Sequence, residues 1–300
     1  MLTGEGSFQR AAVIGAGLMG RRIAGVLARG GLDVAVFDVQ AGTALAGASE
    51  ARAMAASSAT AGTVRAAASL GDAVAGADLM VEAVIENLKV KRDLVTDISR
   101  LSSAVIATNT SVLPVTAIAE AAVDPSRVVG THWWNPPDLI PIVEVVLGAQ
   151  TDPALADGVV HLLTQLRKLP VLVRKDVPGF IGNRLQHALW REALALVVDG
   201  VCAAETVDLV VRNTIGLRLA EMGPLENADY VGLDLTVAIH DAVLPSLDRS
   251  VQASPLLEAL VATGELGAKT GQGLLAWPAG RREQRAQELA AHISNQLTRT

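Results

Sequence analysis

Short apolar runs alternate with helix-like segments through the first part of the chain, up to residue 173. Residues 11–14 are all apolar and are followed at once by glycine, which is typical of a buried parallel strand. Helical spacing of apolar positions then predicts a helix over residues 21–29. Further strands are predicted at residues 32–37, around Val64, and at residues 79–84, 105–108, 128–130, 142–146 and 169–173, with helices between most of them. This alternation predicts an α/β domain with a largely parallel sheet.

The pattern changes at residues 175–184, where Pro178 and Gly179 interrupt it. Beyond this hinge, helical spacing predominates and no strand is predicted. Helices are expected over residues 185–198, 203–212, 230–244, 255–263 and 280–297, and a turn over residues 222–226. We therefore expect two domains: an α/β domain at residues 1–176 and a mostly α-helical domain at residues 177–300.

Composition restricts the class of protein. Half of the residues are apolar and 19% are charged, as in a soluble globular enzyme. The net charge of −6, the lack of a basic run and the 3% of aromatic residues argue against nucleic-acid binding. No apolar run has the length of a membrane span, and residues 1–10 lack a signal-peptide core. The single cysteine, Cys202, fits a reducing compartment, so we expect a cytoplasmic protein.

A glycine motif follows the first predicted strand. Gly15, Gly17 and Gly20 form a GxGxxG pattern that opens the first helix, and Asp38 ends the second strand. In this context the glycines allow a tight turn, a close approach of pyrophosphate to the backbone, and close packing of helix on strand. A carboxylate at Asp38 accepts hydrogen bonds from ribose hydroxyls and repels the additional phosphate of NADP. The sequence therefore predicts a Rossmann-type domain that binds NAD.

His132 and Glu144 are the candidate acid–base pair. A turn separates them, so the carboxylate can fold back onto the imidazole, the minimal equipment of a general base. By spacing alone, a buried structural histidine is the alternative. His132 follows a predicted strand, as do Asn109 and Ser111, and open α/β sheets bind ligands at the carboxyl ends of their strands. This position favours a catalytic pair.

Several separated motifs resemble the L-3-hydroxyacyl-CoA dehydrogenase family, and together they span nearly the whole chain. They lie at residues 15–20, 81–91, 109–111, 132–144, 178–184, 222–224, 229–234 and 269–273. The resemblance implies an NAD-dependent dehydrogenase with a Rossmann-type domain followed by a helical domain. It also implies a homodimer that pairs through apolar helix faces, and the predicted helix at residues 185–198 has a suitable composition.

The resemblance also implies roles for single residues. His132 is the expected general base for the substrate hydroxyl, and Glu144 is expected to orient its imidazole. Ser111 and Asn183 are expected to hydrogen-bond the substrate or His132. The residues expected to bind NAD, from the glycine loop and the resemblance together, are Gly15, Gly17, Leu18, Met19, Gly20, Asp38, Glu86, Lys91 and Asn109. No metal ligands are among the candidates.

One segment departs from the family pattern. Members that act on acyl-CoA carry a helical hairpin that helps to bind CoA, between the second strand and the strand at residues 79–84. Here that segment is too short for the hairpin, and between Asp38 and Glu82 its only cations are Arg52 and Arg65. The pair Trp133–Trp134 is also closer to relatives that oxidise carnitine, gulonate or a pyridine hydroxymethyl group.

Three functions stay open at this point. The first is oxidation of a 3-hydroxyacyl-type substrate, or reduction of its ketone, by hydride transfer with a His–Glu base. The second is the same chemistry on a free small hydroxy acid or alcohol without CoA. The third is a non-catalytic, crystallin-like NAD-binding protein, which the presence of Ser111, His132, Glu144 and Asn183 argues against.

Overall fold

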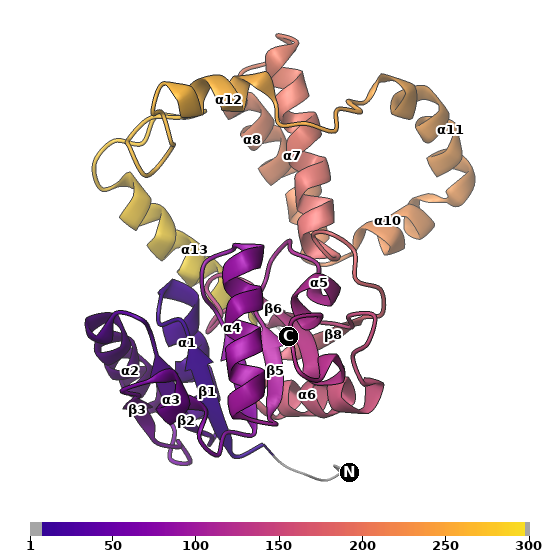
Figure 1. Cartoon of the computed structure of the whole chain (residues 1–300). Coiled ribbons are helices and arrows are strands. Elements are labelled where there is room, and N and C mark those ends of the chain that lie inside the picture. The colour runs from indigo at the N-terminus through magenta and orange to yellow at the C-terminus, as the bar shows by residue number, and fades with distance from the viewer. Residues whose placement is uncertain (1–7, 298–300) are drawn as a thin grey trace. The chain divides into compact units, whose positions relative to one another are not determined.

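The computed structural model describes residues 8–297, and the chain divides into two compact units after Arg184 (Figure 1). The first unit contains an eight-stranded sheet in the order β3-β2-β1-β4-β5-β6-β7-β8. Its strands are β1 Arg10–Ile14, β2 Asp33–Phe37, β3 Val64–Ala66, β4 Leu79–Glu82, β5 Val105–Thr108, β6 Val128–Trp133, β7 Ile142–Val146 and β8 Leu169–Val173. The predicted α/β domain with a mostly parallel sheet is confirmed, as is the helical region that follows it.

The strands β1 to β6 pair in parallel, and the chain reverses direction at β7, which pairs antiparallel with β6. The antiparallel register places His132 directly opposite Glu144. Strand β8 then pairs in parallel with β7. Strand β6 runs on to Trp133, past the predicted end at residue 130, because its antiparallel partner extends the ladder beyond the end of β5. The sheet geometry itself therefore creates the histidine–carboxylate pair.

Helices cover both faces of this sheet (Figure 1). They are α1 Leu18–Arg29, α2 Ala41–Ala55, α3 Leu70–Val74, α4 Leu88–Leu101, α5 Val115–Ala119 and α6 Pro153–Gln165. Alternate residues of β1 enter opposite cores: Val13 packs with Ile23 of α1 and Leu162 of α6, whereas Ile14 packs with Ile98 of α4. Successive residues of a strand face opposite sides of the sheet. Because helices cover both sides here, the buried residues 11–14 of β1 are all apolar.

The second unit consists of helices. Helix α7 Gly182–Val198 begins before the division, and the others are α8 Ala204–Asn213, α9 Ile215–Leu219, α10 Pro224–Val231, α11 Leu233–Val243, α12 Pro255–Ala262 and α13 Arg281–Leu297. The turn predicted at residues 222–226 is wrong, because α10 begins at Pro224, a favourable first helical residue. The single helix predicted over residues 230–244 is interrupted at Gly232, whose φ is 106°.

Two further helices were not predicted from the sequence. Ser69 is the N-cap of helix α3, and its hydroxyl accepts a hydrogen bond from the backbone N–H of Asp72, so the spacing of Ser69 and Asp72 was the available signal. Helix α9 is a single short turn that follows Thr214. Among residues 8–297 we find no helix with the length and apolarity needed to cross a membrane.

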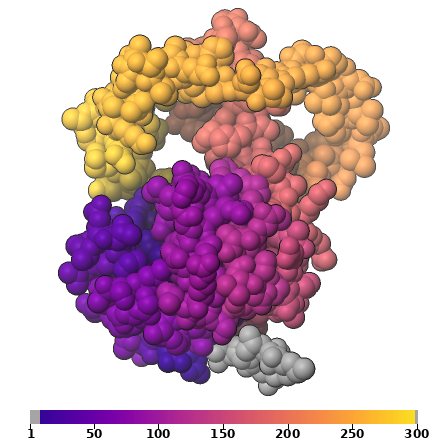
Figure 2. All heavy atoms as spheres, in the orientation of Figure 1, coloured from indigo at the N-terminus to yellow at the C-terminus, as the bar shows by residue number. Residues whose placement is uncertain are grey.

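The second unit has no interior of its own. From Leu185 to Leu297 none of the described residues is buried, whereas the first unit contains two large buried clusters. Large apolar side chains lie exposed along α7, with Leu185 at 59%, Leu189 at 42% and Trp190 at 50%. In Figure 2 the atoms of α11, in orange, have open space on both sides of the helix. These helices therefore present apolar faces that the described chain does not cover.

Candidate functional site

His132 and Glu144 form a buried, hydrogen-bonded pair. The imidazole Nδ1 lies 2.6 Å from Glu144 Oε2, and the two residues are 4% and 2% exposed. The other carboxylate oxygen, Oε1, accepts hydrogen bonds from the backbone N–H groups of Ile181, at 2.9 Å, and Gly182, at 3.1 Å. Burial raises the pKa of Glu144, but the hydrogen bonds from His132 and these two amides outweigh it and hold the pKa below its ordinary value.

An ionised Glu144 selects one tautomer of His132. The carboxylate can only accept, so Nδ1 carries the proton and donates it to Glu144. Nε2 is then left with a lone pair, and no described residue forms a hydrogen bond with it. The arrangement can therefore accept a proton at Nε2 and stabilise the resulting imidazolium through Glu144.

Two aromatic rings border the imidazole. The ring centroid of Trp134 lies 5.0 Å from that of His132, and the centroid of Phe180 lies 5.7 Å away. Trp133, by contrast, is 3% exposed and belongs to the core on the other face of the sheet. A Cβ atom at Gly182 would lie 2.3 Å from the indole of Trp134, so glycine is needed there for this wall to form. Of the two adjacent tryptophans, only Trp134 borders the candidate site.

Ser111 and Asn183 are joined to each other and lie next to the pair. The Asn183 amide Nδ2 donates to the carbonyl oxygen of Ser111 at 3.0 Å, and Asn183 follows Gly182, which is bound by Glu144. Within residues 8–297 no hydrogen-bond partner is found for Ser111 Oγ or Asn183 Oδ1. The four residues predicted to be catalytic are thus linked, and three of them keep a free polar atom.

The glycine loop has the shape that a dinucleotide needs. Gly15 has a φ of +96°, and a Cβ at Gly20 would lie 1.8 Å from the carbonyl oxygen of Gly15, so neither position accepts a side chain. A Cβ at Gly17 would meet nothing within 4 Å, which leaves room for a phosphate. Helix α1 has no side-chain N-cap, so its first N–H groups are free for an anion. The chain's own residues therefore fit NAD.

Asp38 lies against this loop. Its Oδ2 accepts a hydrogen bond from the backbone N–H of Ala16 at 2.9 Å, and its Oδ1 accepts one from Gln40 at 3.0 Å. The other predicted cofactor residues of the loop are Leu18, which is 48% exposed, and Met19, which packs against the core. Asn109 holds the neighbouring strand, because its Oδ1 accepts a hydrogen bond from the backbone N–H of Trp133 at 3.0 Å.

We expect Asp38→Ala to change the choice of cofactor. Loss of the carboxylate removes charged hydrogen bonds to the ribose, worth about 1.5–3 kcal/mol, and the repulsion of a 2′-phosphate. The ratio of kcat/KM for NAD to that for NADP should therefore fall at least about tenfold. Steady-state kinetics with both cofactors measures this ratio, with Asp93→Ala, an exposed residue of α4, as control. An unchanged ratio would contradict the role of Asp38.

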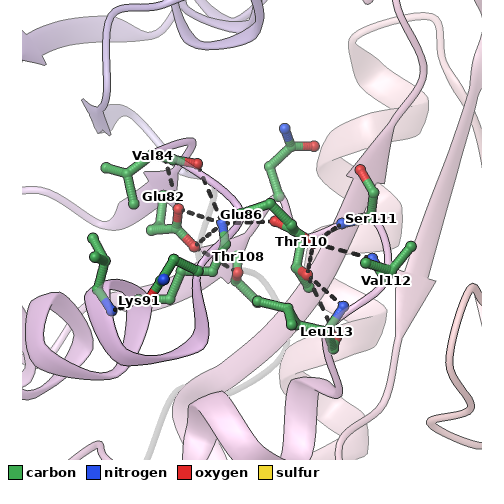
Figure 3. Close-up of polar contacts among 12 residues, drawn as sticks. Glu82, Val84, Glu86, Lys91, Thr108, Thr110, Ser111, Val112 and Leu113 are labelled. Atoms are coloured by element: carbon green, nitrogen blue, oxygen red, sulfur yellow. Dashed lines mark hydrogen bonds and ion pairs between the residues drawn. The ribbon is translucent and has the colours of Figure 1, made fainter. Parts of the chain in front are cut away.

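Glu86 and Lys91 occupy unlike positions (Figure 3). The Glu86 side chain is 34% exposed, whereas Lys91 is fully buried and bound to Glu82 at 2.8 Å. A contact of either residue with NAD stays a prediction. Glu82 was not predicted as a site residue, although a carboxylate at the end of an apolar strand was the available signal.

Lys168 was also missed. Its side chain is buried, and Nζ donates to the carbonyl oxygens of Pro137 at 2.6 Å and Ile140 at 2.9 Å. These carbonyls belong to the loop between His132 and Glu144, which an ion pair from Arg22 to Asp138 ties to α1. Burial, together with the positive charge of Arg29, lowers the pKa of Lys168 to about 8, although Asp138 acts in the opposite direction.

We expect the contribution of Lys168 to stability to depend on pH. Between about pH 8 and 10.5 the unfolded chain holds a proton on this lysine that the folded chain has lost, so the wild type gains stability as pH rises. The free energy of unfolding of wild type minus that of Lys168→Met should rise by about 1–3 kcal/mol across this window. Urea unfolding at each pH measures it, with the exposed Lys89→Met as control. A difference that is flat with pH would contradict the prediction.

Comparison with known proteins agrees with this geometry. Residues 10–177 match the family model for the 3-hydroxyacyl-CoA dehydrogenase NAD binding domain, and residues 179–277 match that for the C-terminal domain. The chain is 38% identical over 277 residues to 5-formyl-3-hydroxy-2-methylpyridine 4-carboxylate 5-dehydrogenase of Mesorhizobium japonicum, covering 89% of this chain and 90% of that protein. It is 36% identical over 275 residues to a probable 3-hydroxybutyryl-CoA dehydrogenase of Deinococcus radiodurans, covering 87% and 97%.

A solved structure shows the same architecture. The crystal structure of a 5-formyl-3-hydroxy-2-methylpyridine 4-carboxylic acid 5-dehydrogenase, described as an NAD+-dependent dismutase, aligns with a TM-score of 0.90 and 34% identity. The alignment covers 95% of this chain and 96% of that one. The predictions of the family and of NAD as cofactor are confirmed. This chain belongs to the 3-hydroxyacyl-CoA dehydrogenase family and is an NAD-dependent oxidoreductase that acts on CH–OH groups.

Proposed function

We propose that this protein oxidises the hydroxyl group of a small substrate without CoA, or reduces the corresponding carbonyl, with His132 as general base. The observation that carries the proposal is the buried His132–Glu144 pair, whose Nε2 has no partner among the described residues. A buried histidine that only supports the fold usually has both ring nitrogens hydrogen-bonded. Here one nitrogen is oriented by a carboxylate and the other is available.

The roles of the residues follow from their free atoms. His132 Nε2 takes the proton of the substrate hydroxyl, and Glu144 stabilises the charge that develops on the imidazole. Ser111 Oγ and Asn183 Oδ1 hydrogen-bond the substrate and hold the reacting carbon in place. The residues of the glycine loop, with Asp38, hold NAD, which accepts the hydride when it is bound. For reduction of a carbonyl, His132 returns the proton.

The two arginines between Asp38 and Glu82 favour a substrate without CoA. Arg52 Nη2 donates to the carbonyl oxygen of Val64 at 2.8 Å, and Arg65 pairs with Asp72 at 2.9 Å. Both arginines between Asp38 and Glu82 are therefore engaged within the fold, and CoA phosphates need cations or helix termini. Between β2 and β3 the structure has the single helix α2, with no helical hairpin. The similarity to a pyridine carboxylate dehydrogenase supports the same choice.

A CoA thioester is the second candidate, since the Deinococcus relative is described as a probable 3-hydroxybutyryl-CoA dehydrogenase. NADH formation with 3-hydroxybutyryl-CoA, and with carrier-free hydroxy acids and hydroxymethylpyridine carboxylates, decides between the two. We expect kcat/KM to be highest for a carrier-free substrate. A preference for the thioester would favour the second candidate, and no turnover with any substrate would favour a non-catalytic NAD-binding protein.

We also propose a homodimer, with a domain boundary at residues 176/177 and a cytoplasmic location. The lack of any buried residue between Leu185 and Leu297 supports the dimer. Helices rarely remain stable in water without burying an apolar face. A second copy of the chain offers the same uncovered faces in return, which is how symmetric dimers form.

A further inference from the structure

Hydrogen bonds hold the end of β5 and the turn that follows it. Thr108 Oγ1 donates to Glu82 Oε2 at 2.7 Å, and Asn109 N–H donates to the carbonyl oxygen of Glu82 at 2.8 Å. The next residues, Thr110 and Ser111, are bound through Glu86. Thr108, Asn109 and Thr110 are buried at the carboxyl end of the sheet, so these bonds satisfy polar groups that water does not reach and fix the position of the turn.

Glu86 is the centre of this arrangement (Figure 3). A single oxygen, Oε1, accepts hydrogen bonds from Thr110 Oγ1 at 2.5 Å and from the backbone N–H groups of Ser111 at 2.9 Å and Val112 at 3.1 Å. The carbonyl oxygen of Ser111 is bound by Asn183. The backbone of Ser111 is therefore fixed on both sides, while its hydroxyl keeps no partner among the described residues.

A buried lysine holds Glu86 in this position. Lys91 Nζ lies 3.3 Å from Glu86 Oε2, and it also contacts both oxygens of Glu82 at 2.8 and 3.0 Å. Lys91 and Glu82 are both fully buried, so the ammonium has no access to solvent. Burial raises the pKa of Glu86, but the bonds from Thr110 and Lys91 and the two amides bring it below its ordinary value. The carboxylate thus stays charged and accepts strongly.

We propose that Glu86 and Lys91 are positioning residues for Ser111: Lys91 holds Glu86, and Glu86 sets the turn that presents the Ser111 hydroxyl to the substrate. The role of Ser111 toward the substrate rests on the proposed function, whereas the contacts from Lys91 through Glu86 to Ser111 do not depend on it. Lys91 acts through the two glutamates, since its side chain is 0% exposed. A conservative change at Glu86 therefore acts on turnover through Ser111.

The first experiment needs no substrate. Hydrogen–deuterium exchange of the peptide that covers residues 108–113 is compared between wild type and Glu86→Gln. Glutamine loses the ion pair and directs an amide group at Lys91, so we expect the amides of Ser111 and Val112 to exchange at least about tenfold faster, as for loss of one charged hydrogen bond. Glu120→Gln, an exposed glutamate paired with Arg92, serves as control and should leave this peptide unchanged. Unchanged exchange in Glu86→Gln overturns the inference.

The second experiment is a double-mutant cycle of Glu86→Gln and Ser111→Ala on kcat. Alone, Glu86→Gln should lower kcat about tenfold, the effect of 1.4 kcal/mol on the barrier. In the Ser111→Ala background it should have almost no further effect on kcat. The Kd for NADH, measured by fluorescence, reports separately on the predicted contact of Glu86 with NAD. Additive losses in kcat overturn the inference.

Lys91→Met tests the second link by the same exchange measurement. It leaves Glu82 buried without its cation, so the fold is checked by circular dichroism, and Glu86→Gln decides if this variant does not fold. We expect faster exchange of the 108–113 peptide, and unchanged exchange overturns the role of Lys91. The wild type could turn over none of the substrates while Glu86→Gln still shows faster exchange. That result would reject the proposed function alone and would support the link between Glu86 and Ser111.

Discussion

Replacing His132 with alanine is expected to lower kcat by about 10²–10⁴-fold, the usual contribution of a positioned general base. The alanine removes Nε2, the one atom of the pair that is free to accept the substrate proton. Binding of NAD should change little, because the residues that fit the dinucleotide lie on the glycine loop and at Asp38. Steady-state kinetics with the best substrate, together with the Kd for NADH, separates these two effects.

The fold of this variant needs a check, since Glu144 loses one partner. Glu144 Oε1 still accepts hydrogen bonds from Ile181 and Gly182, so the carboxylate is not left unpaired. His161→Ala, on the exposed side of α6, is the matched control and should keep wild-type turnover. Undiminished kcat in His132→Ala would reject the assignment of the base, and an equal loss in both variants would point to a general effect on folding.

The pairing of His132 with Glu144 was predictable in outline. An apolar run, a turn and a second apolar run containing one carboxylate are typical of two adjacent strands. Spacing alone does not decide the register, and a shift by one residue would have placed Glu144 on the opposite face of the sheet from His132. The antiparallel reversal of β7 sets that register here. The sequence therefore predicted that His132 and Glu144 pair, but not the strand register that places them directly opposite each other.

Other features depended on burial, which local sequence does not report. The sequence treats Trp133 and Trp134 alike, yet strand alternation sends Trp133 into the core and leaves Trp134 beside His132. A lysine in an amphipathic helix is ordinarily exposed, and Lys91 is buried because Glu82 ends the adjacent strand. Lys168 is buried for a related reason: two loop carbonyls accept its hydrogen bonds.

Separation of the proposed dimer into single chains is expected to unfold the helical unit. No described residue from Leu185 to Leu297 is buried, so the helices lack the apolar burial that offsets the loss of conformational entropy on folding. If a second copy covers these helices, folding and association are coupled, and stability depends on protein concentration. The unfolding midpoint of the wild type should therefore rise as its concentration is raised.

Leu189→Glu places a charge on the apolar face of α7, between exposed Leu185 and Trp190. Burying that charge without a partner should cost at least about 2 kcal/mol and weaken the dimer about thirtyfold or more, the loss typical of an interface hot spot. Analytical ultracentrifugation gives the dimer dissociation constant, and circular dichroism at the same concentrations gives the helical signal. We expect both to fall together, because helices without a covered face do not persist alone.

Gln165→Glu, at an exposed polar position of α6 in the first unit, introduces the same charge outside the helical unit and should leave the dissociation constant nearly unchanged. A wild type that sediments as a monomer with a concentration-independent midpoint would contradict the proposal. A Leu189→Glu variant that stays dimeric would also contradict the proposal, because the apolar face of α7 would then lie outside the contact. Loss of the dimer with the helical signal intact would instead show that these helices are stable without burial by a partner, which contradicts the coupling of folding to association.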